Sequence, residues 1–112
     1  MSEPIHSINS QIVTNGDMTT TITSTAVEVD ESITINVQAT WTGSPVGTIE
    51  LQVSNNPTLL GYTTINASVS AVSGPGTYSV NYERIGFSYV QLVYIPTSGS
   101  GTLNAVLNAK RN

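Results

Sequence analysis

One group of acidic residues has a spacing that could support chemistry. Glu28 and Asp30 have the same parity, so on an extended strand their carboxylates would lie on one face about 7 Å apart. Two carboxylates roughly 5 to 9 Å apart can hydrolyse a glycosidic bond, and together with Asp17 they could bind calcium. Asp-Glu-Ser between two strands is more typical of a turn in which the Asp side chain accepts hydrogen bonds from nearby amides. We therefore expect no catalytic residue, no metal site and no cofactor.

Nucleophilic catalysis has no suitable arrangement of residues either. His6 is the single histidine and lies among Ser and Asn residues, and the chain has no cysteine. A Ser or Thr hydroxyl without a positioned base is a poor nucleophile at neutral pH. The lack of cysteine also excludes a disulfide scaffold and a Cys-ligated zinc site. The sequence predicts a protein that is not an enzyme.

Aromatic residues offer a different kind of chemistry, because exposed rings on a β-sheet can stack on sugars. Trp41, Tyr78 and Tyr82 continue the apolar faces of alternating runs, so we expect them in the core or at its rim. Tyr89 and Tyr94 have opposite parities within one predicted strand. At least one of these two rings must point away from the main core, and that ring is the better candidate for a contact with a partner.

Charge is sparse, and this excludes several kinds of partner. The chain has three Lys or Arg and seven Asp or Glu residues, for a net charge of −4. Arg84, Lys110 and Arg111 form no basic stripe that could follow a phosphate backbone, so we expect no nucleic-acid partner. No apolar run approaches the roughly 20 residues of a membrane helix, and the first residues lack the features of a signal peptide. A neutral, polar surface of this kind is common in extracellular and virion β-proteins.

Strict alternation of apolar and polar residues predicts β-strands, most clearly in residues 33–41 and 49–53. The two runs flank a connection with Gly43, Pro45 and Gly47, residue types that allow a chain to reverse, so the pattern favours a hairpin. The apolar parity of both runs is assigned to the core. The less favourable place for chemistry is then the polar parity, which comprises Thr34, Asn36, Gln38, Glu50 and Gln52.

Other segments add weaker or shorter strands. Residues 17–29 predict two short strands, or one strand broken near Ser24, and residues 65–71 alternate strictly. Residues 87–95 carry apolar side chains on both parities, which indicates a central strand or one covered by a partner. A final strand places the apolar residues of 103–109 inward.

The predicted fold is an all-β, antiparallel two-sheet β-sandwich of about seven to nine strands. A chain of 112 residues is long enough for one domain with its own core, and no window has a helical period. The spacing of strands and turns suits an immunoglobulin-like or a jelly-roll sandwich, and a closed barrel remains an alternative. We expect residues 1–16 to form an extended N-terminal arm that ends at the Asn15-Gly16 turn, and residues 17–112 to form the single β-sandwich domain.

Three segments resemble small β-sandwich structural proteins of tailed bacteriophages. They are ATWTGSPVGTIELQVSNN at residues 39–56, GTY at residues 76–78 and LVYIPTSGSGTLNA at residues 92–105. The family pattern has a Trp/Phe-Thr-Gly-x-Pro-x-Gly-Thr turn, a Leu/Val-Gln-x-Ser-Asn strand and a closing Val-x-Tyr-x-x-x-Ser-Gly-x-Gly-Thr-Leu hairpin. The resemblance spans residues 32–109. It implies a virion structural protein, such as a capsid decoration, head-fibre or tail-associated protein, with no active site.

This resemblance implies a location in the virion after synthesis in the host bacterial cytoplasm. The expected partners are the major capsid protein or another virion protein, and further copies of the chain in a homo-oligomeric dimer or trimer. The residues expected to contact partners are Ile5, Ile8, Ile12, Tyr89 and Tyr94. The alternative is a carbohydrate- or host-surface-recognition module of a phage, which would need exposed aromatic residues with adjacent Asn, Gln or Asp residues.

Overall fold

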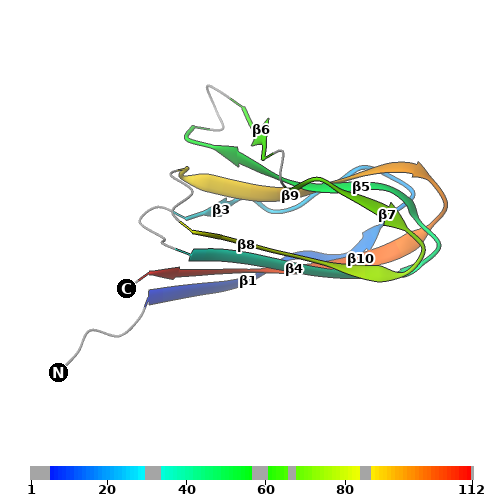
Figure 1. Ribbon diagram of the computed structural model, residues 1–112, viewed down its shortest axis with the longest axis horizontal. Helices are drawn as coiled ribbons and strands as arrows, with labels where there is room; N and C mark the ends of the chain where they lie inside the picture. Colours follow the sequence, from blue (N-terminus) through cyan, green and yellow to red (C-terminus); the bar gives the residue numbers. More distant parts are fainter. Residues whose placement is uncertain (1–5, 30–33, 57–60, 66–67, 84–86, 112) are drawn as a thin grey trace.

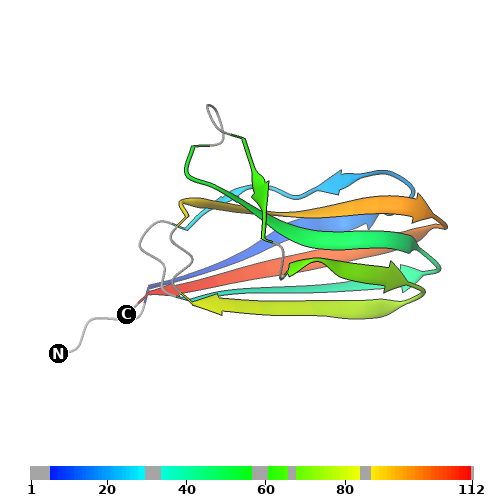
Figure 2. The ribbon, with the colours of Figure 1, turned by 45° about the horizontal axis from the view of Figure 1, so that its top comes forward.

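The computed structural model describes residues 6–29, 34–56, 61–65, 68–83 and 87–111, with side chains from Ile8 to Lys110. These residues form two antiparallel β-sheets packed face to face (Figures 1 and 2). They contain no α-helix, and hence no helix long and apolar enough to cross a membrane. The strands are β1 (His6–Asp17), β2 (Ile22–Thr23), β3 (Val27–Glu28), β4 (Thr34–Gly43), β5 (Val46–Ser54), β6 (Thr63–Thr64), β7 (Ser70–Ser73), β8 (Gly76–Glu83), β9 (Tyr89–Ser98) and β10 (Gly101–Arg111).

The prediction of an antiparallel two-sheet sandwich is confirmed. The first sheet has the order β1-β10-β4-β8, and the second has β9 and β5 at its centre, with β2 and β3 along one edge and β6 and β7 along the other. The described residues hold ten strands instead of seven to nine, because both edges of the second sheet are broken into two short strands. The apolar residues on both parities of residues 87–95 correctly predict that β9 is central.

The strand pairing makes this sandwich a jelly roll. The chain pairs β1 with β10, β2 and β3 with β9, β4 with β8, and β5 with β7, so the pairs are nested as in one long hairpin. The pairings β10 with β4 and β9 with β5 then roll this hairpin into two sheets. This is the jelly-roll topology. The sequence left an immunoglobulin-like and a jelly-roll sandwich open, because local patterns do not encode strand order. The strand order of the structure decides between them.

The predicted hairpin between residues 33–41 and 49–53 is wrong. β4 belongs to the first sheet and β5 to the second, so the connection with Gly43 and Pro45 passes from one sheet to the other. The two apolar faces meet across the core instead of lying side by side. An alternating pattern requires only that one face of each strand is buried. Two strands in opposite sheets meet this requirement as well as two strands of one hairpin do.

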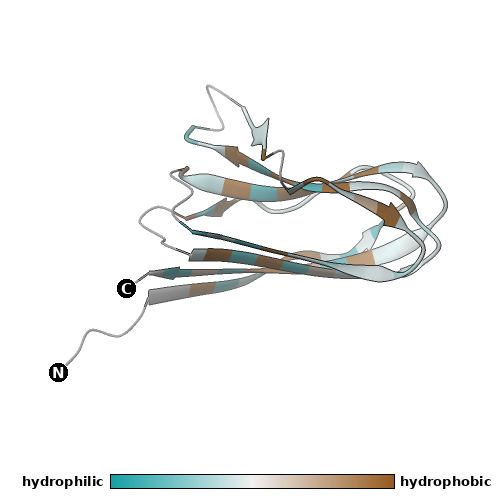
Figure 3. Ribbon diagram, viewed as in Figure 1, coloured by the Kyte–Doolittle hydropathy of each residue, from teal (hydrophilic) through white to brown (hydrophobic). Residues whose placement is uncertain are grey.

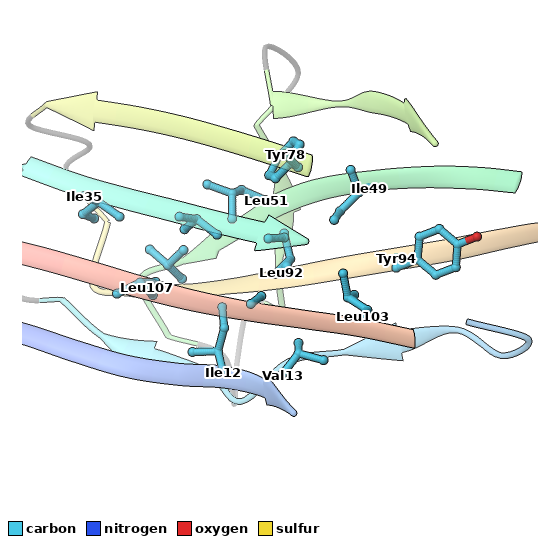
Figure 4. Packing of buried hydrophobic residues seen from close by; sticks show 14 of the residues in the cluster. Ile12, Val13, Ile35, Ile49, Leu51, Tyr78, Leu92, Tyr94, Leu103 and Leu107 are labelled. Carbon is cyan, nitrogen blue, oxygen red and sulfur yellow. The ribbon is translucent and has the colours of Figure 1, made fainter. Parts of the chain in front are cut away.

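The core lies between the two sheets and is filled by the inward parity of the long strands (Figures 3 and 4). The inward residues of 103–109 are buried, as predicted. The largest side chains that are almost completely buried are Tyr94, Met18, Ile35, Ile49, Leu51, Leu92, Leu103 and Leu107.

The predicted N-terminal arm is corrected from His6 onward. His6–Asp17 forms β1, which pairs with β10 at the edge of the first sheet. Ile12 is only 4% exposed and belongs to the core with Val13. The predicted turn at Asn15 is an irregularity within β1, where Asn15 has a φ of 50° and its backbone N–H donates to Asn104 Oδ1 at 2.9 Å. β1 covers an edge of β10 that would otherwise be open, and this favours a strand over a free arm.

Two buried serines replace backbone partners at the breaks in the second sheet. Leu51 of β5 lies opposite Leu92 of β9, at the level where the outer strands are interrupted on both sides. The Leu51 N–H donates to Ser68 Oγ and the Leu92 N–H donates to Ser24 Oγ, both at 2.8 Å. Each serine therefore completes the hydrogen bonding of a central strand.

Ser68 also shows why the predicted strand over residues 65–71 is wrong. Alternation assigns Ser68 to the solvent face, yet it is buried, and Val69 is exposed. The hydroxyl of Ser68 also donates to the Ile65 carbonyl, and the Ile65 N–H donates to the Leu51 carbonyl at 2.9 Å. Among the described residues of this segment, the chain turns inward at Ser68 and the strand begins at Ser70.

Candidate functional site

Of the five residues predicted to contact partners, the four that the structure describes lie in different environments. Tyr94 is 0% exposed in the core, and burial raises the pKa of its hydroxyl. Ile12 is also buried, so neither side chain is available on the surface. Ile8 is 37% exposed, and Tyr89 is half-buried on the outward parity of β9. Ile5 lies outside the described residues.

The acidic residues considered for catalysis or calcium binding do not form a cluster in the described structure. Glu28 is exposed, and its Oε2 accepts a hydrogen bond of 3.2 Å from the Tyr89 hydroxyl. Asp17 Oδ1 accepts hydrogen bonds from the backbone N–H and hydroxyl of Thr19, which lower the pKa of this carboxyl. Asp30 lies outside the described residues. Among the residues that the structure describes, no three His, Asp or Glu side chains gather as metal ligands.

Trp41 and Tyr78 are core residues, as predicted. The Trp41 indole N–H donates to the Gly74 carbonyl at 2.7 Å, and the Tyr78 hydroxyl donates to the Ser68 carbonyl at 2.7 Å. The pKa of the Tyr78 hydroxyl is raised to about 12, mainly by burial. Tyr82 is partly buried and packs against the same core. These rings are therefore not an exposed platform for stacking on sugars.

The outward face of the first sheet carries a line of asparagines, one on each of its four strands. The register places Asn9 of β1 beside Asn108 of β10, Asn108 beside Asn36 of β4, and Asn36 beside Asn81 of β8. We call these four residues the asparagine row. Adjacent strands lie about 4.8 Å apart, so the row presents one primary amide at each such step across the sheet.

The asparagine row borders a hollow in the same face. The hollow has a volume of about 270 Å³ and is lined by Thr34, Asn36, Asn81, Asn108 and Lys110. Among the described residues of this lining, Lys110 is the only charged one. Asn36 Nδ2 donates to the Val80 carbonyl at 3.2 Å, which orients its side chain.

The polar side chains around the hollow are available to a ligand. Within the part of the chain that the structure describes, the side chains of Asn81, Asn108 and Lys110 make no hydrogen bond or ion pair. The polar parity that includes Thr34 and Asn36, assigned above as the less favourable place for chemistry, thus lines the described hollow. Alternation identifies the outward parity, but the asparagines come together only through the register of strands distant in sequence.

The outward face of the second sheet contains a buried polar network. Glu50 Oε2 accepts hydrogen bonds from the Thr64 hydroxyl and from Gln52 Nε2, the latter at 3.0 Å. Gln91 Nε2 donates to Gln52 Oε1 at 2.9 Å. The network joins β9, β5 and β6, and its hydrogen bonds compensate for the burial of the Glu50 carboxylate. We assign it a structural role.

The same sheet has an apolar patch at its other end, made by Val46, Thr48, Ala71 and Ile95. Thr48 of β5 pairs with Ile95 of β9 on one side and with Ala71 of β7 on the other. Val46 is 39% exposed and Ile95 is 43% exposed. We call these four residues the second-sheet patch, and none of them is charged.

No protein-family model and no curated protein matches this sequence. Solved structures share its fold. The SPBc2 prophage-derived protein YomS has a TM-score of 0.57 and 11% identity, over 96% of this chain and 97% of its own. The PBSX exported protein XepA has a TM-score of 0.65 and 16% identity, over 98% of this chain and 39% of its own.

Infectious bursal disease virus of the Gx strain provides a third similar structure, with a TM-score of 0.55 and 10% identity. The match covers 98% of this chain and 33% of the viral chain. This chain therefore spans about two fifths of XepA and a third of the viral protein, but nearly all of YomS. At these identities the likeness concerns the fold, which this chain shares with a prophage-derived protein and with part of a viral protein.

Proposed function

We propose that this chain is a non-enzymatic structural protein of a bacteriophage virion, serving as a capsid decoration or head-fibre component. The observation that carries the proposal is the fold match to prophage-derived YomS, because it extends over nearly the whole length of both chains. The motif resemblance of residues 32–109 to phage β-sandwich proteins supports the same role. The polar surface with few charged side chains suits a protein that is exposed on a particle.

The second-sheet patch is the proposed contact with a second copy of the chain. Each copy has a net charge of −4, so copies repel one another. The patch consists of Val46, Thr48, Ala71 and Ile95, none of which is charged. A contact through the patch therefore places no like charges of the two patches against each other. It also covers two large apolar side chains that are otherwise in water.

The homo-oligomer is tested by sedimentation of the purified protein and of the Ile95→Glu variant. We expect the wild-type protein to form a dimer or trimer at high concentration and the variant to be monomeric, because the new carboxylate would be buried at the interface. Thr40→Glu is the matched control, since Thr40 is an exposed strand residue on the first sheet and leaves the patch unchanged. A purely monomeric wild-type protein would contradict the proposed contact.

The virion role is tested on purified phage particles produced by the host that encodes the chain. Immunogold labelling with an antibody to the chain is expected to mark the head of the particle. Protein that remains in the lysate and is absent from the particles would refute this role. Glycan recognition is the second candidate function, and the hollow beside the asparagine row favours it.

A further inference from the structure

We infer that the hollow beside the asparagine row binds an acidic oligosaccharide, with sugar hydroxyls at the asparagine amides and a sugar carboxylate at Lys110. The inference develops the glycan recognition named above as the second candidate function. It does not depend on a location in the virion.

The amides provide the chemistry that recognises sugar hydroxyls. A primary amide has two N–H donors and a carbonyl acceptor, and a hydroxyl group both donates and accepts. The side chains of Asn81 and Asn108 are free of hydrogen bonds within the described residues. Asn36 uses Nδ2 for the Val80 carbonyl, so its orientation is set. Asn36 Oδ1 can still accept a hydrogen bond from a hydroxyl.

The dimensions of the hollow suit a short oligosaccharide. The amides of Asn108, Asn36 and Asn81 come from three adjacent strands and therefore extend about 10 Å across the sheet. Thr34 and Lys110 form the neighbouring row, about 7 Å farther along the strands. The volume of about 270 Å³ lies just below the 300–1,000 Å³ that is typical of small-molecule sites, which limits the ligand to a few rings.

Charge determines where the carboxylate of the ligand lies. Lys110 is the only charged lining residue, and it has no ion-pair partner among the described residues. Glu83 lies in the same row but two strands away, about 10 Å across the sheet, with Thr34 between them. An anionic sugar is thus attracted at the β10 side of the hollow and repelled at the β8 side. This polarity gives the ligand a preferred direction.

The test is NMR titration of the full chain labelled with nitrogen-15. The acidic probes are trigalacturonate, sialyllactose and a hyaluronan tetrasaccharide; the controls are a neutral galactose trisaccharide and triglutamate, a non-sugar anion. We expect at least one acidic probe to shift the side-chain amide signals of Asn81 and Asn108. Equal shifts with triglutamate would overturn the assignment to sugars, and no shift with any acidic probe would overturn the inference.

Variants locate the site. Asn81→Ala combined with Asn108→Ala should abolish the shifts of backbone amides around the hollow. Lys110→Gln should weaken the binding of acidic probes by up to about fivefold at low salt. Lys110→Arg keeps the charge and should retain binding. Gln38→Ala is the matched control, because Gln38 is exposed on β4 but does not line the hollow. Unchanged binding in the double variant would overturn the inference, while the particle test of the virion role would be unaffected.

Discussion

At the scale of single residues, the two buried serines show that a single hydroxyl group can determine local structure. Ser24 and Ser68 occupy the two places where the outer strands of the second sheet are interrupted. Each hydroxyl accepts the backbone N–H of a central leucine. Without the hydroxyl, that N–H would be buried and unpaired, which is costly in a protein interior.

The substitution Ser68→Ala is expected to lower the free energy of unfolding by about 1–3 kcal/mol, because it leaves the Leu51 N–H without a partner. Urea unfolding measures this loss. Ser70→Ala is the matched control, since Ser70 is exposed and its replacement should change stability by less than about 0.5 kcal/mol. Equal effects of the two substitutions would contradict the role assigned to Ser68.

Tyr78 predicts an alkaline loss of stability. Burial raises its pKa from 10.0 to about 12 in the folded protein, so the folded state holds the proton more tightly than the unfolded state. This contribution to stability is complete below pH 10 and is lost as the pH rises from 10 to 12. Burial raises the pKa of Tyr94 as well, and its contribution is lost in the same direction.

The urea midpoint of the wild-type protein should therefore fall between pH 10 and 12. Tyr78→Phe should make this fall shallower, with the remainder due in part to Tyr94. A midpoint that stays constant over this range would show that Tyr78 ionises as readily in the folded protein as in the unfolded chain.

At the scale of elements, β1 explains why spaced isoleucines near the N-terminus do not by themselves identify a contact with a partner. Ile8 and Ile12 both lie in this strand, yet Ile12 is buried and Ile8 is 37% exposed. Pairing with β10 and packing under the second sheet determine which of them enters the core. The Thr25 N–H also donates to the Ile12 carbonyl at 3.2 Å, which ties β1 to the second sheet.

We expect Ile12→Ala to destabilise the protein by about 2–5 kcal/mol through loss of core packing. Ile8→Ala in the same strand should cost less than about 1 kcal/mol, because the side chain is already partly in water. Thermal unfolding of both variants measures the difference. Similar losses would mean that β1 is not packed as the structure shows.

The connections between the sheets depend on glycine where two of them touch. Gly99, between β9 and β10, has a φ of 78°, and a Cβ there would lie 2.1 Å from the Ser44 carbonyl oxygen in the β4–β5 connection. Gly74 has a φ of 74°, but no atom lies within 4 Å of its added Cβ. The two positions share backbone strain and differ in available space.

Gly74→Ala should therefore cost about 1–2 kcal/mol, the usual penalty for an L-residue in this conformation. Gly99→Ala should cost clearly more, because the two connections would have to separate and lose the hydrogen bond of 2.8 Å from the Ser44 N–H to the Ser100 carbonyl. Urea unfolding of the two variants makes the comparison. A Gly99 variant as stable as the Gly74 variant would exclude close packing of the two connections.

At the scale of the whole molecule, the nested strand pairs link segments that are far apart in sequence. β1 pairs with β10, so the sheet joins residues from the two ends of the described chain. Such distant pairings must form against a large loss of chain entropy, so proteins built this way fold slowly.

We predict a refolding time of milliseconds to seconds. Stopped-flow fluorescence of Trp41, the single tryptophan, measures this rate because its indole becomes buried on folding. Complete refolding faster than about a millisecond would show that local contacts dominate the folding barrier.

The sequence predicts much of the fold because alternation is a local signal. Residues 35–41, 49–53 and 103–109 have the predicted buried parity, and Trp41 and Tyr78 lie in the core. The same signal fails at Ser68, where a hydrogen bond outweighs alternation, and at the supposed hairpin, where it leaves the partner sheet undetermined. It also leaves the hollow unpredicted, since Asn36, Asn81 and Asn108 lie on three different strands.

By itself, the sequence determined the all-β class, the core-facing side of the main strands and a surface with few charges. These properties follow from side-chain type and a period of two, which operate over a few residues. Only the tertiary structure decided the jelly-roll order, the inclusion of β1, the choice of Tyr89 over Tyr94 as the accessible ring and the hollow beside the asparagine row. Each of these depends on which distant strands pair and in what register, and the whole hydrophobic core determines that choice.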